Sequence, residues 1–140
     1  MDVGKPFDYL KAKLDRSKED LDDARDLFQQ GKYRLSVNRA YYGVFHIVSA
    51  TLAAMGHERT KHSGVEAAFH QYLIGSGLLE KEHGVTYKLA RKLREDADYG
   101  IDKVITEEIA RDILEQCERL ARHVEQYLYK SGLIPRKQDA

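Results

Sequence analysis

Residues 35–57 read LSVNRAYYGVFHIVSATLAAMGH, and this stretch decides the fold. It contains a single formal charge, Arg39, although charged residues make up 33% of the chain. Apolar side chains recur along it at the three- and four-residue spacing of one helix face. They are Val37, Tyr41, Val44, Phe45, Val48, Leu52 and Met55. The opposite face is small or aromatic, and a helix that is apolar nearly all round is buried on two sides. We therefore predict a central bundle helix over about residues 33–55.

The same stretch is a poor candidate for a membrane span. Its uncharged run, residues 40–56, is 17 residues long and contains His46, Ser49 and Thr51. A transmembrane helix needs about 20 predominantly apolar residues. We expect no contact with a membrane.

An amphipathic helix is predicted upstream, over about residues 6–30. Its apolar face consists of Leu10, Leu14, Leu21, Ala24 and Phe28. Its other face carries lysines and arginines among six acids, which are Asp15, Glu19, Asp20, Asp22, Asp23 and Asp26. A run of mixed charge usually forms a solvated helix face, and we interpret these acids in that way.

Three further helices are predicted downstream. One covers residues 63–74, where Ser63 and Glu66 have the spacing of a capping box. The next covers residues 86–97, with an inward face of Leu89, Ala90, Leu93 and Ala97. The last starts after Thr106 as the N-cap, and its apolar face consists of Ile109, Ile113, Cys117, Leu120, Val124 and Leu128. No segment alternates with period two, so the expected fold is all-α, an up-and-down helical bundle of about five helices. We expect one domain over residues 1–132 and a short tail over residues 133–140.

The charge balance limits the classes of function. The 140 residues include 23 basic and 23 acidic side chains, so the formal net charge is zero. A generic nucleic-acid binder normally carries a basic excess, and the balance argues against that class. One cysteine cannot form an intramolecular disulfide, and no signal peptide opens the sequence, so we expect a cytoplasmic location.

Metal and cofactor chemistry is not indicated. The six histidines lack the His-Glu-x-x-His and Glu-x-x-His spacings that bind zinc or di-iron, and we expect no metal and no cofactor. Cys117 lies on an apolar stripe, where a small buried thiol is the common case. The segment 75–79 lacks the lysine of a phosphate-binding loop.

Two arginine sites remain as candidates. In the first, Arg39, Tyr42 and His46 recur at intervals of three and four and share one helix face. Gly43 lies beside them and leaves room for another backbone or for a ligand. A guanidinium in this position needs an anionic or carbonyl partner. Arg39 either pairs with a carboxylate of a neighbouring helix or contacts a phosphate or RNA, and the spacing leaves both open.

In the second site, Arg91, Arg94 and Asp98 share a face, and Tyr99 stands at the helix end. Arg94 and Asp98 are four residues apart and can form an ordinary ion pair. The same helix terminus, with its arginine, acid and phenol, also suits an anion-binding site. Spacing alone does not decide between these interpretations.

Three sequence blocks suggest a family. They are residues 38–46 (NRAYYGVFH), 61–65 (KHSGV) leading to Phe69, and 93–100 (LREDADYG). Together they resemble the HEPN domain family, in particular its small stand-alone prokaryotic members, over about residues 7–130. The resemblance implies a helical bundle, frequent homodimers, and genes beside a minimal nucleotidyltransferase in toxin–antitoxin-type modules.

Many HEPN domains are metal-independent ribonucleases with an Arg-x(4–6)-His motif, in which the arginine holds phosphate and the histidine assists transfer to a 2′-hydroxyl. Here the fifth residue after Arg94 is Tyr99 instead of histidine. Arg39 and His46 have the motif spacing, but Ala40 follows the arginine and the helix is an earlier one. The chain therefore resembles the family in its three blocks but lacks the usual Arg-x(4–6)-His ribonuclease motif after Arg94.

The resulting hypothesis is a partner of a nucleotidyltransferase that contacts a nucleotide or RNA. The residues assigned to that contact are Arg39, Tyr42, His46, His62 and Asp98. One alternative is a homodimeric ribonuclease toxin with Arg94 and Tyr99 as catalytic residues, in which two protomers bring these and His62 or His46 to a shared cleft. Another is a structural adaptor dimer, in which Arg39 and Arg94 form buried ion pairs.

Overall fold

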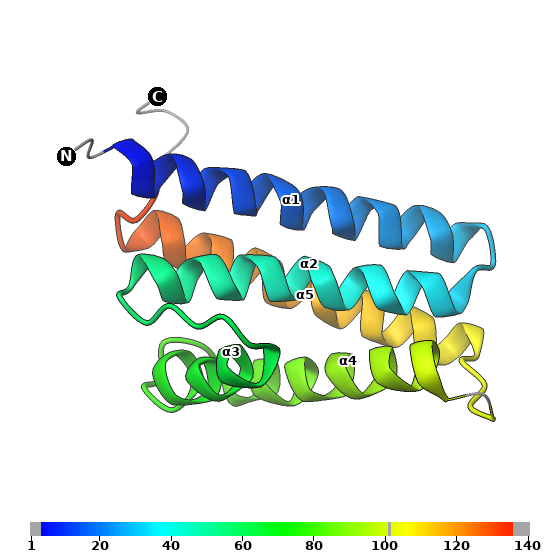
Figure 1. Cartoon of the computed structure of the whole chain (residues 1–140). Helices are drawn as coiled ribbons and strands as arrows, with labels where there is room; N and C mark the ends of the chain where they lie inside the picture. Colours follow the sequence, from blue (N-terminus) through cyan, green and yellow to red (C-terminus); the bar gives the residue numbers. More distant parts are fainter. Residues whose placement is uncertain (1–3, 101, 136–140) are drawn as a thin grey trace.

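The computed structural model describes residues 4–100 and 102–135, with side chains from Phe7 onward. Its elements are α1 (Gly4–Gln29), α2 (Tyr33–Ala54), α3 (His62–Phe69), the π-helical segment η1 (His70–Ile74), α4 (Lys81–Tyr99) and α5 (Glu107–Lys130). Every regular element in the described ranges is helical, and the all-α prediction is confirmed. The four long helices run alternately up and down (Figure 1). The first three residues of the predicted domain and the last five of the predicted tail lie outside the described residues. Ile134, at the start of that tail, is buried against the core.

The helix α2 lies at the centre of the bundle. It packs against α1, α4 and α5, and in Figure 1 it runs between α1 and α4. Residues of both its faces are buried, including Val37 and Val44 on one face and Gly43 and Ala50 on the other. The two-sided burial predicted from its low charge is confirmed.

Gly43 sets the distance between α1 and α2. The hydroxyl of Ser17 donates a hydrogen bond of 2.6 Å to the carbonyl oxygen of Gly43. A Cβ atom at Gly43 would lie 2.6 Å from Cγ of Leu21, closer than real side chains approach. The room beside Gly43 is therefore filled by α1, and of the two predicted uses the neighbouring backbone is the correct one.

The N-termini of two helices differ from prediction. The helix α3 begins at His62 with Lys61 as its N-cap, and no side chain caps it. The capping box is therefore wrong, because Glu66 accepts a hydrogen bond from Arg91 instead. The helix α4 begins five residues before Thr86, in a polar stretch that the apolar pattern did not reveal. The predicted Thr106 cap of α5 is confirmed, since its hydroxyl accepts from the Ile109 amide at 3.1 Å.

Two residues assigned to the core are on its edge. Leu89 and Ile109 are 38% and 37% exposed. The neighbouring residues Ala90 and Ala110 take the interior positions and are 1% and 0% exposed. Small side chains there let α4 and α5 approach the core closely. Within the described ranges, none of the helices combines the length and apolarity needed to cross a bilayer.

Candidate functional site

The two arginine sites of the sequence form a single cluster between α2 and α4. The Cζ atom of Arg39 lies 5.0 Å from the centre of the Tyr42 ring. The Cζ atom of Arg94 lies 5.5 Å from the centre of the same ring. One partly buried tyrosine thus brings both guanidinium groups together.

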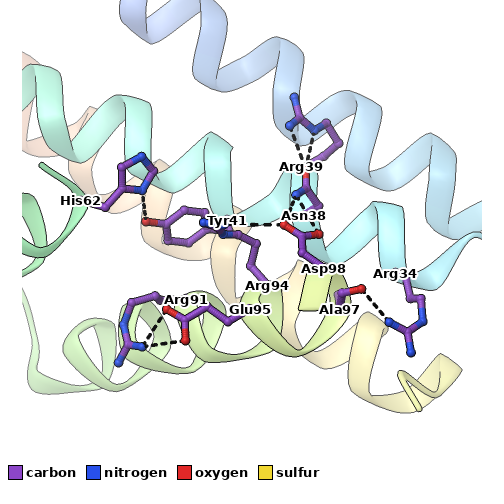
Figure 2. A network of polar contacts seen from close by, with 10 residues as sticks. All are labelled: Arg34, Asn38, Arg39, Tyr41, His62, Arg91, Arg94, Glu95, Ala97 and Asp98. Atoms are coloured by element: carbon purple, nitrogen blue, oxygen red, sulfur yellow. Dashed lines mark hydrogen bonds and ion pairs between the residues drawn. The ribbon is translucent and has the colours of Figure 1, made fainter. Parts of the chain in front are cut away.

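A chain of hydrogen bonds and one ion pair also connects the two arginines, as Figure 2 shows. The side-chain oxygen of Asn38 accepts from Nε and Nη2 of Arg39, at 3.0 and 2.7 Å. The side-chain amide of Asn38 donates to both oxygens of Asp98, at 3.2 and 3.0 Å. Asp98 in turn lies 3.6 Å from Nη1 of Arg94. The i,i+4 pair predicted from spacing is therefore present, as one member of a longer network.

Arg94 is held against aromatic side chains. Its Cζ atom lies 5.3 Å from the centre of the Tyr41 ring, and its side chain is only 15% exposed. Its Nε atom is buried and has no hydrogen-bond partner among the described residues. Aromatic rings attract a guanidinium electrostatically but do not accept all of its N–H groups. Arg94 therefore combines a fixed position with unused hydrogen-bonding capacity, which suits an oxyanion.

Arg39 is anchored on α1 by a buried acid, Asp20. The carboxylate of Asp20 is 3% exposed and lies 3.4 Å from Nη1 of Arg39, 3.6 Å from Arg16 and 3.5 Å from Nε2 of His46. Arg39 itself is 32% exposed. The predicted ion pair with a neighbouring helix is therefore present, but its buried member is the acid.

The solvated-face interpretation was wrong for Asp20. The residue follows Ser17 by three positions and precedes Leu21, and both of these side chains are buried against α2. Asp20 thus lies at the edge of the apolar stripe. That position beside the stripe was the one signal in the sequence that Asp20 lies close to the next helix, and it does not reveal which cation the acid meets.

His46 extends this end of the cluster. Its ring centre lies 6.2 Å from that of Tyr42. Burial lowers the pKa of His46, while the carboxylate of Asp20 acts in the opposite direction. The net lowering favours the neutral imidazole beside Tyr42.

His62, on α3, lies at the other end of the cluster. Its Nδ1 atom is 2.8 Å from the hydroxyl oxygen of Tyr41, and its ring stacks on Phe45 at 4.1 Å between ring centres. Burial and the positive charge of Arg94 both lower the pKa of His62. Burial raises the pKa of Tyr41, which therefore keeps its proton. The cluster thus pairs a cation with a neutral histidine, a combination able to hold an anion and accept a proton.

The structure brings most of the predicted site residues together, but it leaves one outside. The residues of the cluster are Arg39, Tyr42, His46, His62, Arg94 and Asp98. Tyr99, the last residue of α4, is 74% exposed and takes no part in the contacts above. Arg91, on the same helix, pairs with Glu66 and Glu95.

Sequence reasoning did not single out Asn38 or Tyr41 as functional. Asn38 bridges Arg39 and Asp98, and Tyr41 connects Arg94 to His62. Both lie inside the NRAYYGVFH block, so the block marked the place without revealing the roles. In the described ranges, no group of three or more His, Cys, Asp or Glu side chains is arranged to hold a metal ion.

Comparison with known proteins places this cluster in a family context. The family model described as "HEPN domain" matches residues 10–127. The chain is 36% identical over 113 residues to a "UPF0332 protein" of Thermotoga maritima, an alignment that covers 81% of this chain and 86% of the relative. It is 34% identical over 119 residues to a protein of Methanocaldococcus jannaschii that bears the name "Putative toxin MJ0605", covering 85% of this chain and 88% of the relative.

Proposed function

The chain belongs to the HEPN domain family, and on that premise we propose that it is the RNA-contacting component of a toxin–antitoxin-type module. The observation that carries the proposal is Arg94, whose guanidinium lies near two tyrosine rings and whose ion pair among the described residues is a 3.6 Å contact of Nη1 with Asp98. The Nη groups are the donors for a phosphate oxygen of RNA, while the buried Nε stays inside the cluster.

The partly buried aromatic rings of the cluster support RNA rather than an isolated anion. Single-stranded RNA is recognised through bases that stack on aromatic side chains or on guanidinium planes. Tyr42 and Phe45 are partly buried and border His62, so they offer ring surface next to the cation. A phosphate at Arg94 and a base at these rings are features of one nucleotide.

The module is inferred from the relatives. Two proteins of M. jannaschii that resemble the chain, at 34% and 25% identity, bear names that begin with "Putative toxin". With the family resemblance, this supports a minimal nucleotidyltransferase as the partner and a homodimer as the working form. The identity of the neighbouring gene tests the partnership. A neighbouring gene that encodes a nucleotidyltransferase supports it. Purification of the tagged protein from its own host with no nucleotidyltransferase bound counts against it.

RNA contact is tested with the purified chain. A fluorescent single-stranded RNA of about eight nucleotides is titrated in EDTA, and the anisotropy is followed. We expect saturable binding that weakens as salt is raised, because phosphate contacts release counterions. Anisotropy that does not change at any protein concentration contradicts RNA contact.

A second function, RNA cleavage without a metal, is favoured by the position of His62. When Nδ1 holds the proton and donates to the hydroxyl oxygen of Tyr41, Nε2 is left with a free lone pair. It then accepts the proton of a 2′-hydroxyl, whose oxygen bonds to phosphorus as the bond to the 5′-oxygen breaks. The leaving oxygen takes a proton from water, and the products are a 2′,3′-cyclic phosphate and a 5′-hydroxyl. In this hypothesis His62 takes the role of the missing motif histidine.

Cleavage has its own test. The chain and its His62→Asn variant are incubated with a labelled RNA in EDTA, and the ends of the products are analysed. We expect cyclic phosphate ends from the native protein and a loss of at least about a hundredfold in the variant, the order that one proton-transfer group contributes. RNA that remains intact with native protein overturns this second function and leaves RNA contact to the binding experiment.

A further inference from the structure

A basic groove lies at the end of the bundle where the α1–α2 turn meets the α4–α5 connection. Both connections are at the right-hand end of Figure 1. The groove has a volume of about 460 Å³. Its walls include Lys32, Arg34 and Lys103, together with the apolar side chains of Leu35 and Val104. We name it the Lys32–Lys103 groove.

The cations of this groove have no acidic partner among the described residues. None of the ion pairs between those residues includes Lys32, Arg34 or Lys103, and no described acid lines the groove. In the Arg94 cluster, by contrast, Asp98 and Asp20 offset the arginines. The chain has no net charge, so this groove is a local excess of positive charge. An excess of this kind attracts a polyanion.

Arg34 is fixed in place without being neutralised. Its guanidinium donates hydrogen bonds to the carbonyl oxygens of Ala97, at 2.6 Å, and of Gly100 and Lys103. These carbonyls belong to the end of α4 and the connection that follows it. Neutral acceptors position a cation but leave its full charge, so Arg34 is a preorganised positive point in the wall of the groove.

The groove also offers apolar surface. Leu35 is 55% exposed and Val104 is 76% exposed, and both line it. Isolated exposed apolar side chains are ordinary. A pair of them between three cations matches a ligand that alternates apolar rings with charged groups, as a nucleic-acid strand does.

The groove adjoins the Arg94 cluster. Arg34 and Asn38 are four residues apart on α2, which is about 6 Å along the helix axis. Their partners are also adjacent, since Arg34 bonds Ala97 and Asn38 bonds Asp98. Figure 2 shows these two contacts side by side between α2 and α4. A strand that leaves the cluster in this direction enters the groove directly.

We propose that the Lys32–Lys103 groove binds the phosphodiester backbone of a single-stranded RNA next to the nucleotide held at Arg94. The inference rests on the proposed RNA contact and extends it. It assigns the salt-dependent part of the affinity to the groove, because the arginines of the cluster are already offset by acids. The apolar pair, Leu35 and Val104, faces the sugar or base of the same strand.

The test measures how RNA affinity depends on salt. The Kd of the same fluorescent RNA is determined over a series of KCl concentrations for the native chain and for Lys32→Gln/Lys103→Gln. The matched control is Lys11→Gln/Lys81→Gln, which removes two exposed lysines, one near the start of α1 and one at the start of α4. Both of these helix starts lie at the end of the bundle opposite the groove (Figure 1). Each phosphate contact on a single strand adds about 0.7 to the slope of log affinity against log salt, so we expect the groove variant to bind more weakly and to lose about 1.4 of slope. We expect the control to match the native chain, and a groove variant that also matches it overturns the proposal.

The experiments distinguish a failure of the groove proposal from a failure of the proposed RNA contact at Arg94. If the groove variant binds RNA with native affinity and Arg94→Ala binds weakly, the groove proposal is wrong and the proposed function stands. Weak binding by the groove variant, with native affinity in Arg94→Ala, supports the groove and removes the contact at Arg94. If the groove variant keeps RNA affinity but loses an acidic protein partner, the groove is a protein-binding site and the RNA proposal is wrong.

Discussion

The side-chain amide of Asn38 donates to both carboxylate oxygens of Asp98, and this contact joins α2 to α4 beside Arg94. Asp98 also pairs with Arg94, so its carboxylate lies beside the guanidinium group that we propose binds an RNA phosphate. Asp98 thus competes with the ligand from within the chain.

The competition predicts an effect of Asp98→Asn on RNA affinity. Asparagine keeps an oxygen that accepts from Asn38 but removes the negative charge beside Arg94. We expect the variant to bind RNA several-fold more tightly, since about 1 kcal/mol of lost competition corresponds to roughly fivefold in Kd. Anisotropy titrations at low salt measure this, and weaker binding by Asp98→Asn would mean that the carboxylate helps the ligand.

The buried carboxylate of Asp20 predicts a loss of stability. Asp20→Asn keeps the shape of the side chain but leaves Arg39 and Arg16 without their acid. We expect the free energy of unfolding to fall by about 1–3 kcal/mol in urea titrations. Asp23→Asn changes an exposed acid of the same helix and is expected to stay within about 0.5 kcal/mol of the native value. Equal effects of the two substitutions would contradict the assignment of Asp20 to the core of the network.

The contact between α1 and α2 predicts opposite effects for two glycine substitutions. Gly43→Ala places a Cβ atom 2.6 Å from Cγ of Leu21, and overpacking of this kind costs about 1–3 kcal/mol. Gly64→Ala, inside α3, places a Cβ atom in ordinary contact with Arg59 at 3.5 Å. We expect this control to be neutral or stabilising, because alanine favours a helix over glycine by about 1 kcal/mol. Thermal melting compares the two, and a stable Gly43→Ala protein would refute the close approach.

The histidines predict that the fold weakens in mild acid. Burial lowers the pKa of His46, His62, His70 and His83 in the folded state. The lowering for His83, which is 2% exposed, also comes from the neighbouring His123. Since the unfolded chain binds these protons at the ordinary pKa of about 6.5, the unfolded state holds more protons below that pH. Stability is therefore complete above about pH 6.5 and falls as the pH drops toward the folded-state pKa values.

Melting temperatures across this range check the effect. We expect a higher Tm at about pH 7.5 than at about pH 5.5. His83→Gln, which removes one titrating group and keeps a donor for Nδ1 of His123, is expected to reduce the difference. A Tm that stays constant or rises on acidification is the opposite result.

The sequence was sufficient for the architecture because its strongest signals are local. The scarcity of charge in residues 35–57 predicted a helix buried on two sides, and Thr106 predicted the start of α5. The start of α3 could not be read in the same way. Ser63 and Glu66 have the spacing of a cap, but the partner that Glu66 meets, Arg91, comes from α4. A contact across 25 residues leaves no local pattern.

The candidate site was predicted in its parts but not in its assembly. Arg39 and Arg94 were identified as separate sites, since spacing reports only which residues share a face of one helix. Their connection through Asn38 and Asp98 depends on how α2 packs against α4. Asp20 was missed for a related reason, because an acid at the edge of an apolar stripe looks solvated until the next helix covers it.

A comparison of Arg94→Ala with Arg111→Ala decides whether Arg94 holds RNA. Arg111 is a matched control, because it also pairs with an acid four residues away, Glu107, and lies 5.7 Å from the ring centre of Phe28. The Kd for the single-stranded RNA is measured for both variants at one salt concentration, after their Tm values show that both are folded. A charged hydrogen bond to phosphate contributes about 1.5–3 kcal/mol, so we expect Arg94→Ala to bind about ten- to a hundredfold more weakly and Arg111→Ala to bind like the native chain. Equal affinities for the two variants would contradict the assignment of RNA contact to Arg94.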